Sequence, residues 1–261
     1  MFYKRFPHHT SIPSKANRLI DIHLSKSLEI NVSEELDRDN LYFIGGPVSS
    51  LYNLTRLQQS NTPYINVDKG YFRTKKTTHW RLSVNSLQQL MLFDVPADRL
   101  QNIDYFKIEP WQTSGDYVLI LAPNPAPLQL YQQHTDVLKW CIDTKNEILK
   151  YTDRKVFIRF KESSKSRGKD SLSKYLKDCH AVISLQSIGC VQTICKGIPT
   201  YNLAESCLDG LGNFSIKDIE NPVKPDNRYE WLKSLAYGQF TIDEIENGTA
   251  INILQALYKF H

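Results

Sequence analysis

Residues 181–202 read Ala181-Val-Ile-Ser-Leu-Gln-Ser-Ile-Gly-Cys-Val-Gln-Thr-Ile-Cys-Lys-Gly-Ile-Pro-Thr-Tyr-Asn202. The apolar run 181–185 predicts a buried strand, and the segment 187–196 has the spacing of a helix. Gly197 and Pro199 then turn the chain into a second strand. Strands that alternate with helices at this spacing are joined by crossovers, so the stretch predicts a parallel sheet.

The same alternation extends toward the first half of the chain. The apolar run 116–122 lies between Gly115 and Pro123 and predicts a strand that is buried on both faces of a sheet. Three further elements are expected here: helical spacing at 130–149, a strand at 155–160 and a helix at 171–179. Together these elements predict an α/β fold with a doubly wound, parallel sheet.

The first half of the chain repeats this pattern less regularly. The expected elements are a strand at 40–44 that ends in Gly45-Gly46-Pro47, a helix at 49–59 and a strand at 63–67. A polar stretch at 112–116 separates the two halves, and Thr241-x-x-Glu244 is a capping box that predicts a helix near the C-terminal end. We therefore expect three parts: an N-terminal Rossmann-like domain at 1–114, a second Rossmann-like domain at 115–225, and C-terminal helices at 226–261 that pack back on the first domain.

The composition of the 261 residues is that of a globular protein. Apolar residues make up 41% and charged residues 23%, which excludes a disordered or fibrous chain. The longest strongly apolar run, 117–122, is far shorter than the roughly 20 residues that span a bilayer, and the first residues do not resemble a signal peptide. The five cysteines form no Cys-x-x-Cys pair, which favours reduced, buried thiols over disulfides or a zinc site. We expect a cytoplasmic protein without a bound metal.

Positive charge is concentrated in two segments. The segment 154–177 has nine Lys or Arg residues and two acidic residues, and the segment 68–81 has five Lys or Arg residues and one acidic residue. Together the two segments carry a charge of +11 in a chain whose net charge is +4. Such a concentration indicates a polyanionic partner, either the phosphates of a nucleotide or a nucleic-acid backbone. A solvated surface is the alternative for each segment taken alone.

Polar residues follow the expected strands of the second half. Arg159 and Lys161 come after one strand, with Arg167 further on, and the segment 184–189, Ser-Leu-Gln-Ser-Ile-Gly, comes after the next. Ligands of parallel sheets bind at the carboxyl ends of the strands, and the start of a helix suits a phosphate. We therefore expect a phosphate site here; the alternative is that Ser187 merely caps a helix.

The first half offers a candidate base at the end of its last strand. Asp68 follows that strand, and His79 comes soon after; a carboxylate or an imidazole at this position could deprotonate a hydroxyl group. A turn acid and a packed histidine are the alternatives. Gly45 and Gly46 match neither G-x-G-x-x-G nor a Walker A loop, so they are either a tight turn or a place where another molecule approaches the backbone.

The block 179–201 resembles the donor-binding half of GT-B-type transferases, in particular bacterial capsule Kdo transferases and CDP-glycerol glycerophosphotransferases, which have a strand, a Ser-rich turn, a helix and Gly-Ile-Pro in this order. Four other stretches resemble small glycosyltransferases encoded by tailed bacteriophages: Ile219-Glu-Asn-Pro222, Arg228-Tyr-Glu-Trp-Leu232, 235–245 and His79-Trp-Arg-Leu-Ser-Val-Asn85. The resemblance implies two Rossmann-like domains that face a cleft. It also implies sugar transfer from a nucleotide donor without a bound metal.

The resemblance assigns roles to particular residues. The second domain of such enzymes holds the nucleotide, and the first supplies the acceptor site and the base, which points to Asp68 first and His79 second. The donor set we expect is Gly45, Gly46, Arg159, Lys161, Arg167, Ser184, Gln186, Ser187, Gly189 and Glu205. The chain departs from the family in being short, in having Gln186 where a second Ser or Thr is common, and in lacking a Glu-x7-Glu signature.

The acceptor suggested by the phage resemblance is a hydroxymethylated pyrimidine in DNA. Basic and aromatic residues in 69–81 would contact the phosphates and stack on bases: Lys69, Tyr71, Arg73, Trp80 and Arg81. A base inside a duplex would first have to be flipped out. A surface glycan, a glycerophosphate-type transfer and a non-catalytic nucleic-acid-binding protein are the alternatives.

Overall fold

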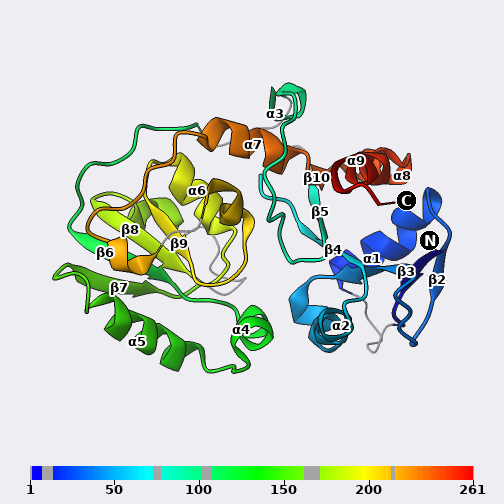
Figure 1. Cartoon of the computed structure of the whole chain (residues 1–261), viewed down its shortest axis with the longest axis horizontal. Coiled ribbons are helices and arrows are strands. Elements are labelled where there is room, and N and C mark those ends of the chain that lie inside the picture. The colour runs from blue at the N-terminus through cyan, green and yellow to red at the C-terminus, as the bar shows by residue number, and fades with distance from the viewer. Residues whose placement is uncertain are drawn as a thin grey trace. The chain divides into compact units, whose positions relative to one another are not determined.

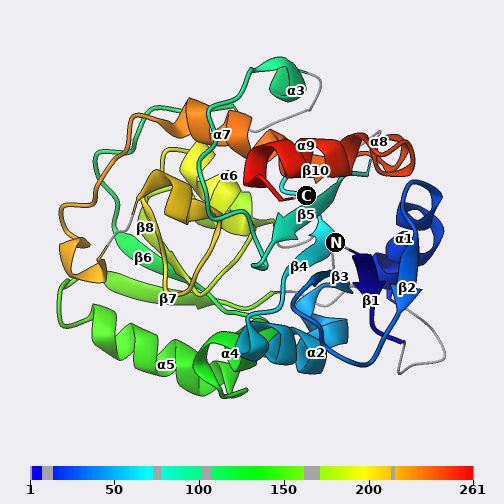
Figure 2. The same cartoon turned by 45° about the vertical axis from the view of Figure 1, so that its right-hand side comes forward.

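The computed structural model describes residues 2–7, 14–72, 78–101, 107–161, 171–212 and 215–260, except for the side chain of Ser49. The chain has an α/β fold with two sheets, as the sequence predicts. It divides into two compact units (Figures 1 and 2): unit 1 is Met1–Tyr105 with Glu230–His261, and unit 2 is Phe106–Tyr229.

The sheet of unit 1 is mixed. Its strands, in spatial order, are β10 (Gln239–Phe240), β5 (Trp80–Val84), β4 (Tyr64–Lys69), β3 (Asn40–Gly45), β1 (Phe2–Arg5) and β2 (Ile30–Val32). The four strands β1 to β4 run parallel, whereas β5 runs antiparallel to β4 with Lys69 opposite Trp80. The predicted strands at 40–44 and 63–67 are confirmed. The antiparallel β5 follows from the length of its connection, since the link 70–79 is shorter than the dozen or more residues that a parallel crossover needs.

Helices cover both faces of this sheet. The helices of unit 1 are α1 (Lys15–Ile22), η1 (Leu24–Lys26), α2 (Pro47–Ser60), α3 (Asp98–Gln101), α8 (Ile242–Glu246) and α9 (Thr249–Tyr258), and α7 (Arg228–Ala236) includes the boundary between the units. One core joins Leu19 of α1, Phe43 of β3 and Leu254 of α9. On the opposite face, Gln58 of α2 donates a 3.2 Å hydrogen bond to the hydroxyl of Tyr64.

Successive side chains of a strand point to opposite faces of a sheet. In β4, Ile65 and Val67 therefore belong to the core with α1 and α9, and in β5 Trp80 and Leu82 do the same. The residues between them face the other way: Asn66 and Asp68 in β4, and Arg81 and Ser83 in β5. The alternation thus puts a row of polar side chains on the face opposite the core.

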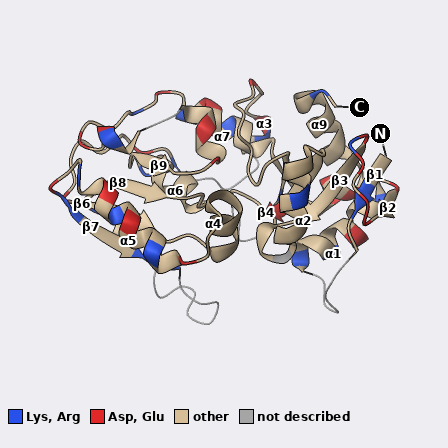
Figure 3. Ribbon diagram, turned by 60° about the horizontal axis from the view of Figure 1, so that its bottom comes forward, with Lys and Arg blue, Asp and Glu red and all other residues tan. Residues whose placement is uncertain are grey.

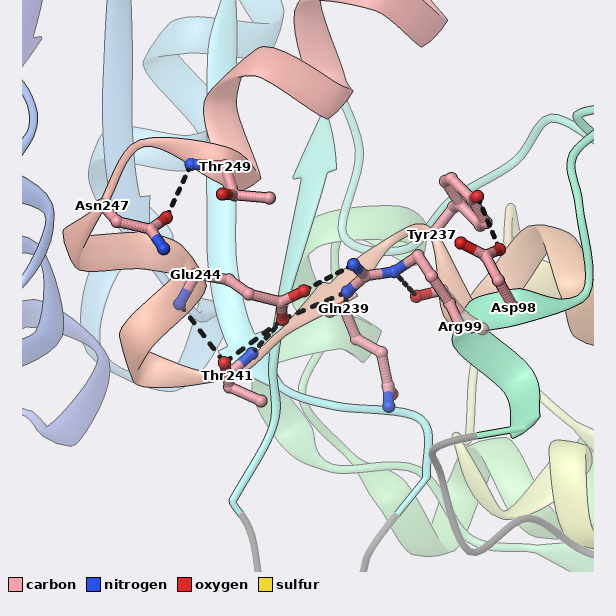
Figure 4. Close-up of polar contacts among 9 residues, drawn as sticks. Asp98, Arg99, Tyr237, Gln239, Thr241, Glu244, Asn247 and Thr249 are labelled. Carbon is pink, nitrogen blue, oxygen red and sulfur yellow. Dashed lines mark hydrogen bonds and ion pairs between the residues drawn. The ribbon is translucent and has the colours of Figure 1, made fainter.

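Arg99 of α3 holds the C-terminal segment of unit 1. Its guanidinium donates to the carbonyl oxygen of Gln239 at 2.8 Å and forms an ion pair with Glu244 of α8 (Figure 4). Glu244 also closes the capping box with Thr241 that the sequence predicts, accepting from the Thr241 amide at 2.8 Å. These contacts position the short strand β10 beside β5.

The sheet of unit 2 is parallel throughout, which confirms the prediction for this half. Its strands, in spatial order, are β7 (Lys155–Arg159), β6 (Tyr117–Leu121), β8 (Cys179–Ser184) and β9 (Thr200–Asn202). Its helices are α4 (Pro125–Gln132), α5 (Val137–Ile148), η2 (Leu172–Tyr175), α6 (Gly189–Cys195), η3 (Cys207–Leu211) and η4 (Ile216–Asp218). Figures 1 and 2 show α5 and α6 on opposite faces of this sheet.

Two predicted helices differ from the structure. The helical spacing at 130–149 is divided between α4 and α5, because Gln133 ends α4 in a left-handed conformation (φ 58°) and Asp136 caps the start of α5. The predicted helix at 171–179 is the short 3₁₀ turn η2, after which the left-handed Asp178 (φ 57°) leads into β8. Periodicity alone did not reveal these interruptions.

Three further features bear on the class of protein. No helix in the described ranges is long and apolar enough to cross a membrane. All five cysteines are buried, and none of them forms a disulfide. No group of three His, Cys, Asp or Glu side chains that could hold a metal ion gathers among the residues whose placement is described.

Candidate functional site

Asp68 and Arg81 form an ion pair on the polar face of the unit 1 sheet. They lie directly opposite each other in the β4–β5 pair, and the Nη2 of Arg81 is 3.1 Å from the Oδ2 of Asp68. The side chain of Arg81 is 3% exposed and that of Asp68 is 33% exposed. A buried cation thus holds a carboxylate that remains partly exposed to solvent.

Two other features fix the carboxylate of Asp68. Its Oδ1 accepts a 2.8 Å hydrogen bond from the backbone amide of Lys69. Gly46 leaves room for it, since a Cβ atom at this position would lie 3.2 Å from the Cγ of Asp68. Gly45 similarly leaves room for Asn17 of α1. The glycine pair therefore accommodates side chains of the protein itself, as a tight turn does; its predicted role in donor binding stays a prediction.

The surroundings of Arg81 contain several buried polar atoms without hydrogen-bond partners. Its own Nε and Nη1 atoms have none among the described residues, and neither do the Oδ1 of Asn66, the Oγ of Ser83 and the Nε2 of Gln239. Ser83 lies opposite Asn66, and Gln239 lies opposite Arg81. The guanidinium also lies over the ring of Tyr71, with its Cζ 5.1 Å from the ring centroid. The sequence analysis did not single out Asn66, Ser83 and Gln239.

His79, the second candidate base, lies directly before β5. It is buried, with 8% of its surface exposed, and its carbonyl oxygen accepts a 2.9 Å hydrogen bond from the amide of Gly70. The placement agrees with a packed histidine, and a catalytic role of His79 stays a prediction.

Burial does not fit the predicted contacts of three residues with a polyanion. Trp80 belongs to the hydrophobic core, and Tyr71 is buried with its hydroxyl accepting a 2.7 Å hydrogen bond from the amide of Gln89. Arg81 is buried against Asp68. Side chains in these positions have no open face for a base or a phosphate, because β5 alternates and puts Trp80 and Arg81 on its two covered faces.

The remaining predicted acceptor residues are at the surface or outside the described ranges. Lys69 is exposed, and Arg73 lies outside the described residues. Figure 3 shows that Lys and Arg are spread over both units and often lie beside Asp and Glu. On α5, for example, Lys139 forms a 2.6 Å ion pair with Asp143.

The carboxyl ends of the unit 2 strands bring most of the predicted donor residues to one edge of the sheet. Arg159 ends β7 and Ser184 ends β8, which are both neighbours of β6. Lys161 and Glu205 are exposed in the segments that follow β7 and β9, and Arg167 lies outside the described residues. Gln186 donates a 3.2 Å hydrogen bond to the hydroxyl of Tyr131 on α4. This polar edge is where parallel sheets bind ligands.

The two serines at this edge cap the turn before α6. The hydroxyl of Ser184 accepts from the amide of Ser187 at 2.8 Å, and the hydroxyl of Ser187 accepts from the amide of Gly189 at 3.1 Å. Gly189 lies close to Leu172, whose Cδ2 would be 3.2 Å from a Cβ at this position. These contacts are those of a hydrogen-bonded turn before the helix and a close packing position, while the N-cap residue Ile188 has no side-chain capping bond. Phosphate binding by Ser184, Ser187 and Gly189 stays a prediction.

Unit 2 also has a polar cavity that the sequence analysis missed. It has a volume of about 290 Å³ and lies near the amino ends of the strands, opposite the expected donor edge; its lining consists of Gln112, Thr113, His180, Glu220, Asn221, Pro222 and Lys224. Glu220 forms an ion pair with Arg154, whose Nη2 is 3.0 Å from its Oε2. The hydrogen bond from Thr152, followed by that from Arg154, holds the pKa of Glu220 below its usual range. The pair fixes the segment around η4 to the start of β7.

Comparison with known proteins gives a similarity of fold. No protein-family model and no curated protein matches the chain. A solved structure of Thermosulfurimonas dismutans KpsC, a beta Kdo 2,7 transferase, covers 97% of this chain and 100% of its own, with a TM-score of 0.51 and 10% sequence identity. The structure of the beta Kdo 2,4 transferase of the same KpsC covers 96% of this chain and 98% of its own, with a TM-score of 0.47 and 11% sequence identity. The first similarity confirms, for the fold, the resemblance to capsule-type Kdo transferases.

Proposed function

We propose that the protein is a glycosyltransferase that moves a sugar from a nucleotide-activated donor to a hydroxyl group of an acceptor. Unit 2 would bind the donor in the manner of a GT-B transferase, and unit 1 would supply the acceptor site and the base. The observation that carries the proposal is the carboxylate of Asp68, which two hydrogen bonds hold at the end of β4 while one third of the side chain stays exposed.

In the proposed reaction, Asp68 takes the proton of the acceptor hydroxyl as that oxygen attacks the anomeric carbon of the donor sugar. The bond between the anomeric carbon and the phosphate oxygen breaks, and the nucleotide leaves with the electron pair. Negative charge develops on the departing phosphate, so cations placed there stabilise the transition state. Arg159 and Lys161, at the carboxyl edge of the unit 2 sheet, are the described residues suited to this role.

Two findings support the donor half of this proposal. The unit 2 sheet is parallel and has polar side chains at its carboxyl ends, where nucleotides bind in such folds. The fold is also similar to that of a beta Kdo 2,7 transferase over nearly the whole chain. At 10% identity this likeness is one of fold alone, so the activity needs a direct test.

The first test is binding of nucleotides, measured as a thermal shift with UDP, GDP, CDP, CMP and dTDP. A ligand at 100 times its Kd adds about 2.7 kcal/mol to stability, which raises the melting temperature. We expect a rise with one base, and Ser187→Tyr should abolish it by filling the turn before α6. Ser215→Tyr is the matched control, since Ser215 caps η4 in the same unit by accepting from the amide of Lys217.

The acceptor is tested by transfer of labelled sugar from the donor found in this way. A hydroxymethylated pyrimidine in DNA and a saccharide hydroxyl are the two classes to compare. Three of the five residues expected to contact DNA are buried, namely Tyr71, Trp80 and Arg81, and this burial favours the saccharide. Salt-dependent DNA binding without a thermal shift from any nucleotide would contradict the transferase and support a nucleic-acid-binding protein.

A further inference from the structure

We propose that Arg81 is a positioning residue that orients the carboxylate of Asp68 for proton transfer. The inference rests on the proposed function, in which Asp68 is the base. It gives Arg81 a different role from the one that its place in a basic segment suggests, because its guanidinium is turned to a carboxylate of its own sheet and not to the surface.

The first argument is the geometry of the pair. Asp68 and Arg81 are partners in the β4–β5 ladder, so the distance between their backbones is set by the sheet. One oxygen of Asp68 accepts from the Nη2 of Arg81 at 3.1 Å, and the other accepts from the amide of Lys69 at 2.8 Å. Each carboxylate oxygen is therefore held by one donor and keeps a lone pair for the acceptor hydroxyl.

The second argument is that Arg81 is itself immobilised. Its side chain is 3% exposed, and the ring of Tyr71 lies 5.1 Å from its Cζ. The hydroxyl of Tyr71 accepts from the amide of Gln89, which fixes the ring. The neighbouring strand is fixed as well, since the Oε1 of Gln239 accepts from the amide of Phe72 at 3.0 Å. A guanidinium in such a setting has little freedom to follow a moving carboxylate; it dictates the orientation of the carboxylate.

The third argument is that the pair is poorly built for stability alone. The Nε and Nη1 atoms of Arg81 are buried without a hydrogen-bond partner in the described part of the chain. Burying a cation with unsatisfied donors is unfavourable, and a structural pair would use both sides of the guanidinium fork. Asp68 instead takes one bond from Arg81 and leaves a third of its side chain exposed. The arrangement gives up hydrogen bonds and keeps the carboxylate accessible.

The test compares Arg81→Met and Arg81→Lys with the wild-type protein in steady-state transfer assays. For R81M we expect kcat to fall about 10- to 100-fold, because a small misplacement of a reacting group has an effect of this order. The KM for the donor should stay unchanged. R81K, which keeps the charge, should lie between R81M and the wild type, and added guanidinium ion should restore part of the kcat of R81M. A merely structural role of Arg81 predicts neither an intermediate kcat for R81K nor a recovery of R81M with guanidinium ion.

Arg5→Met is the matched control. Arg5 forms a 2.7 Å ion pair with Asp21 in the same unit and does not touch Asp68, so its loss should affect stability and not kcat. The inference is overturned if R81M keeps the wild-type kcat, or if R5M loses as much kcat as R81M. If R81M does not fold, the kcat and the donor KM of R81K are compared with those of the wild type and R5M in its place.

The outcomes separate this inference from the proposed function. Wild-type protein that transfers no sugar from any donor would overturn both. Wild-type protein that is active, with Asp68→Asn inactive and R81M fully active, would overturn the positioning role alone.

Discussion

In unit 1, the buried Arg81 and the partly buried Arg99 each pair with a carboxylate, and the two pairs are built differently. Arg99 donates from Nε to the carbonyl of Ala236 at 3.0 Å, from Nη2 to that of Gln239, and from both Nη atoms to Glu244. Arg81 has one hydrogen bond, to Asp68, and two buried nitrogen atoms without a partner among the described residues. Both guanidinium groups lie over aromatic rings.

The difference is the one that we expect between a pair that stabilises the fold and the functional pair that we propose. Arg99 satisfies its donors and joins three segments, α3, the end of α7 and α8, so its pair stabilises the fold (Figure 4). Arg81 leaves donors unsatisfied and holds a carboxylate that remains 33% exposed. Natural proteins accept local losses of stability at functional sites. The following predictions test this division.

The largest effect is expected for Asp68→Asn. The amide keeps the shape and can accept from Arg81, but it takes up no proton, so kcat should fall about 10²- to 10⁴-fold, the usual contribution of a general base. The measurement is kcat at a temperature well below the melting transition of both proteins. Near wild-type turnover of D68N would show that Asp68 is only the counter-ion of Arg81.

The next effect concerns stability. Arg99→Met should lower the free energy of unfolding by about 2–3 kcal/mol, because it removes charge-assisted hydrogen bonds to a carboxylate that is largely buried. Urea unfolding of the mutant and the wild type measures this. We expect kcat to be unchanged. A loss of kcat like that of R81M would remove the distinction between the two arginines.

The pH dependence of stability provides a smaller effect at the same pair. Burial raises the pKa of Glu244, but the hydrogen bonds from Arg99 and the Thr241 segment outweigh burial and hold it below its usual range. A carboxyl group whose pKa is lowered by folding contributes stability above its unfolded pKa of about 4.3. That contribution is lost as the pH falls through the lower pKa of the folded state.

The measurement is urea unfolding of the wild type and Arg99→Met from pH 7 to pH 3. The mutant should lose less stability than the wild type below about pH 4.3, since its Glu244 has lost the guanidinium. Parallel curves for the two proteins would mean that the pair does not set the charge of Glu244.

The sheet of unit 2 was predictable from local patterns. Its apolar runs at 118–121 and 181–184 are buried on both faces, and the long connections between its successive strands, which contain helices, are typical of parallel pairing. The ends of helices were harder to predict. Gln133 and Asp178 adopt left-handed conformations, which in a sequence are usually indicated by a glycine. Because neither position is a glycine, the sequence did not predict the breaks after α4 and η2.

The pairing of Asp68 with Arg81 was not predicted because it depends on register. A one-residue shift of β5 against β4 would turn Arg81 to the other face. The sequence did contain a signal: Trp80, Leu82 and Val84 alternate with Arg81 and Ser83, which is typical of a strand with one apolar face. The high positive charge of 68–81 led instead to a surface interpretation. The pair of Arg154 and Glu220 joins residues 66 positions apart and has no local signal at all.

The smallest effect is expected at the cysteines, which, like Arg99, we expect to contribute to the fold and not to the reaction. Burial raises the pKa of Cys141 to about 11 and that of Cys179, Cys190 and Cys195 to about 12. At pH 8 such thiols contain at least about two orders of magnitude less thiolate than a free cysteine with a pKa of about 8.5, and thiolate is the reactive form. Ellman's reagent should therefore react slowly with the native protein and promptly with all five thiols in urea, and treatment of the native protein should leave kcat unchanged. If a thiol reacts at once in the native state and its modification abolishes transfer, a cysteine would take part in the reaction, and this would contradict the proposed mechanism based on Asp68.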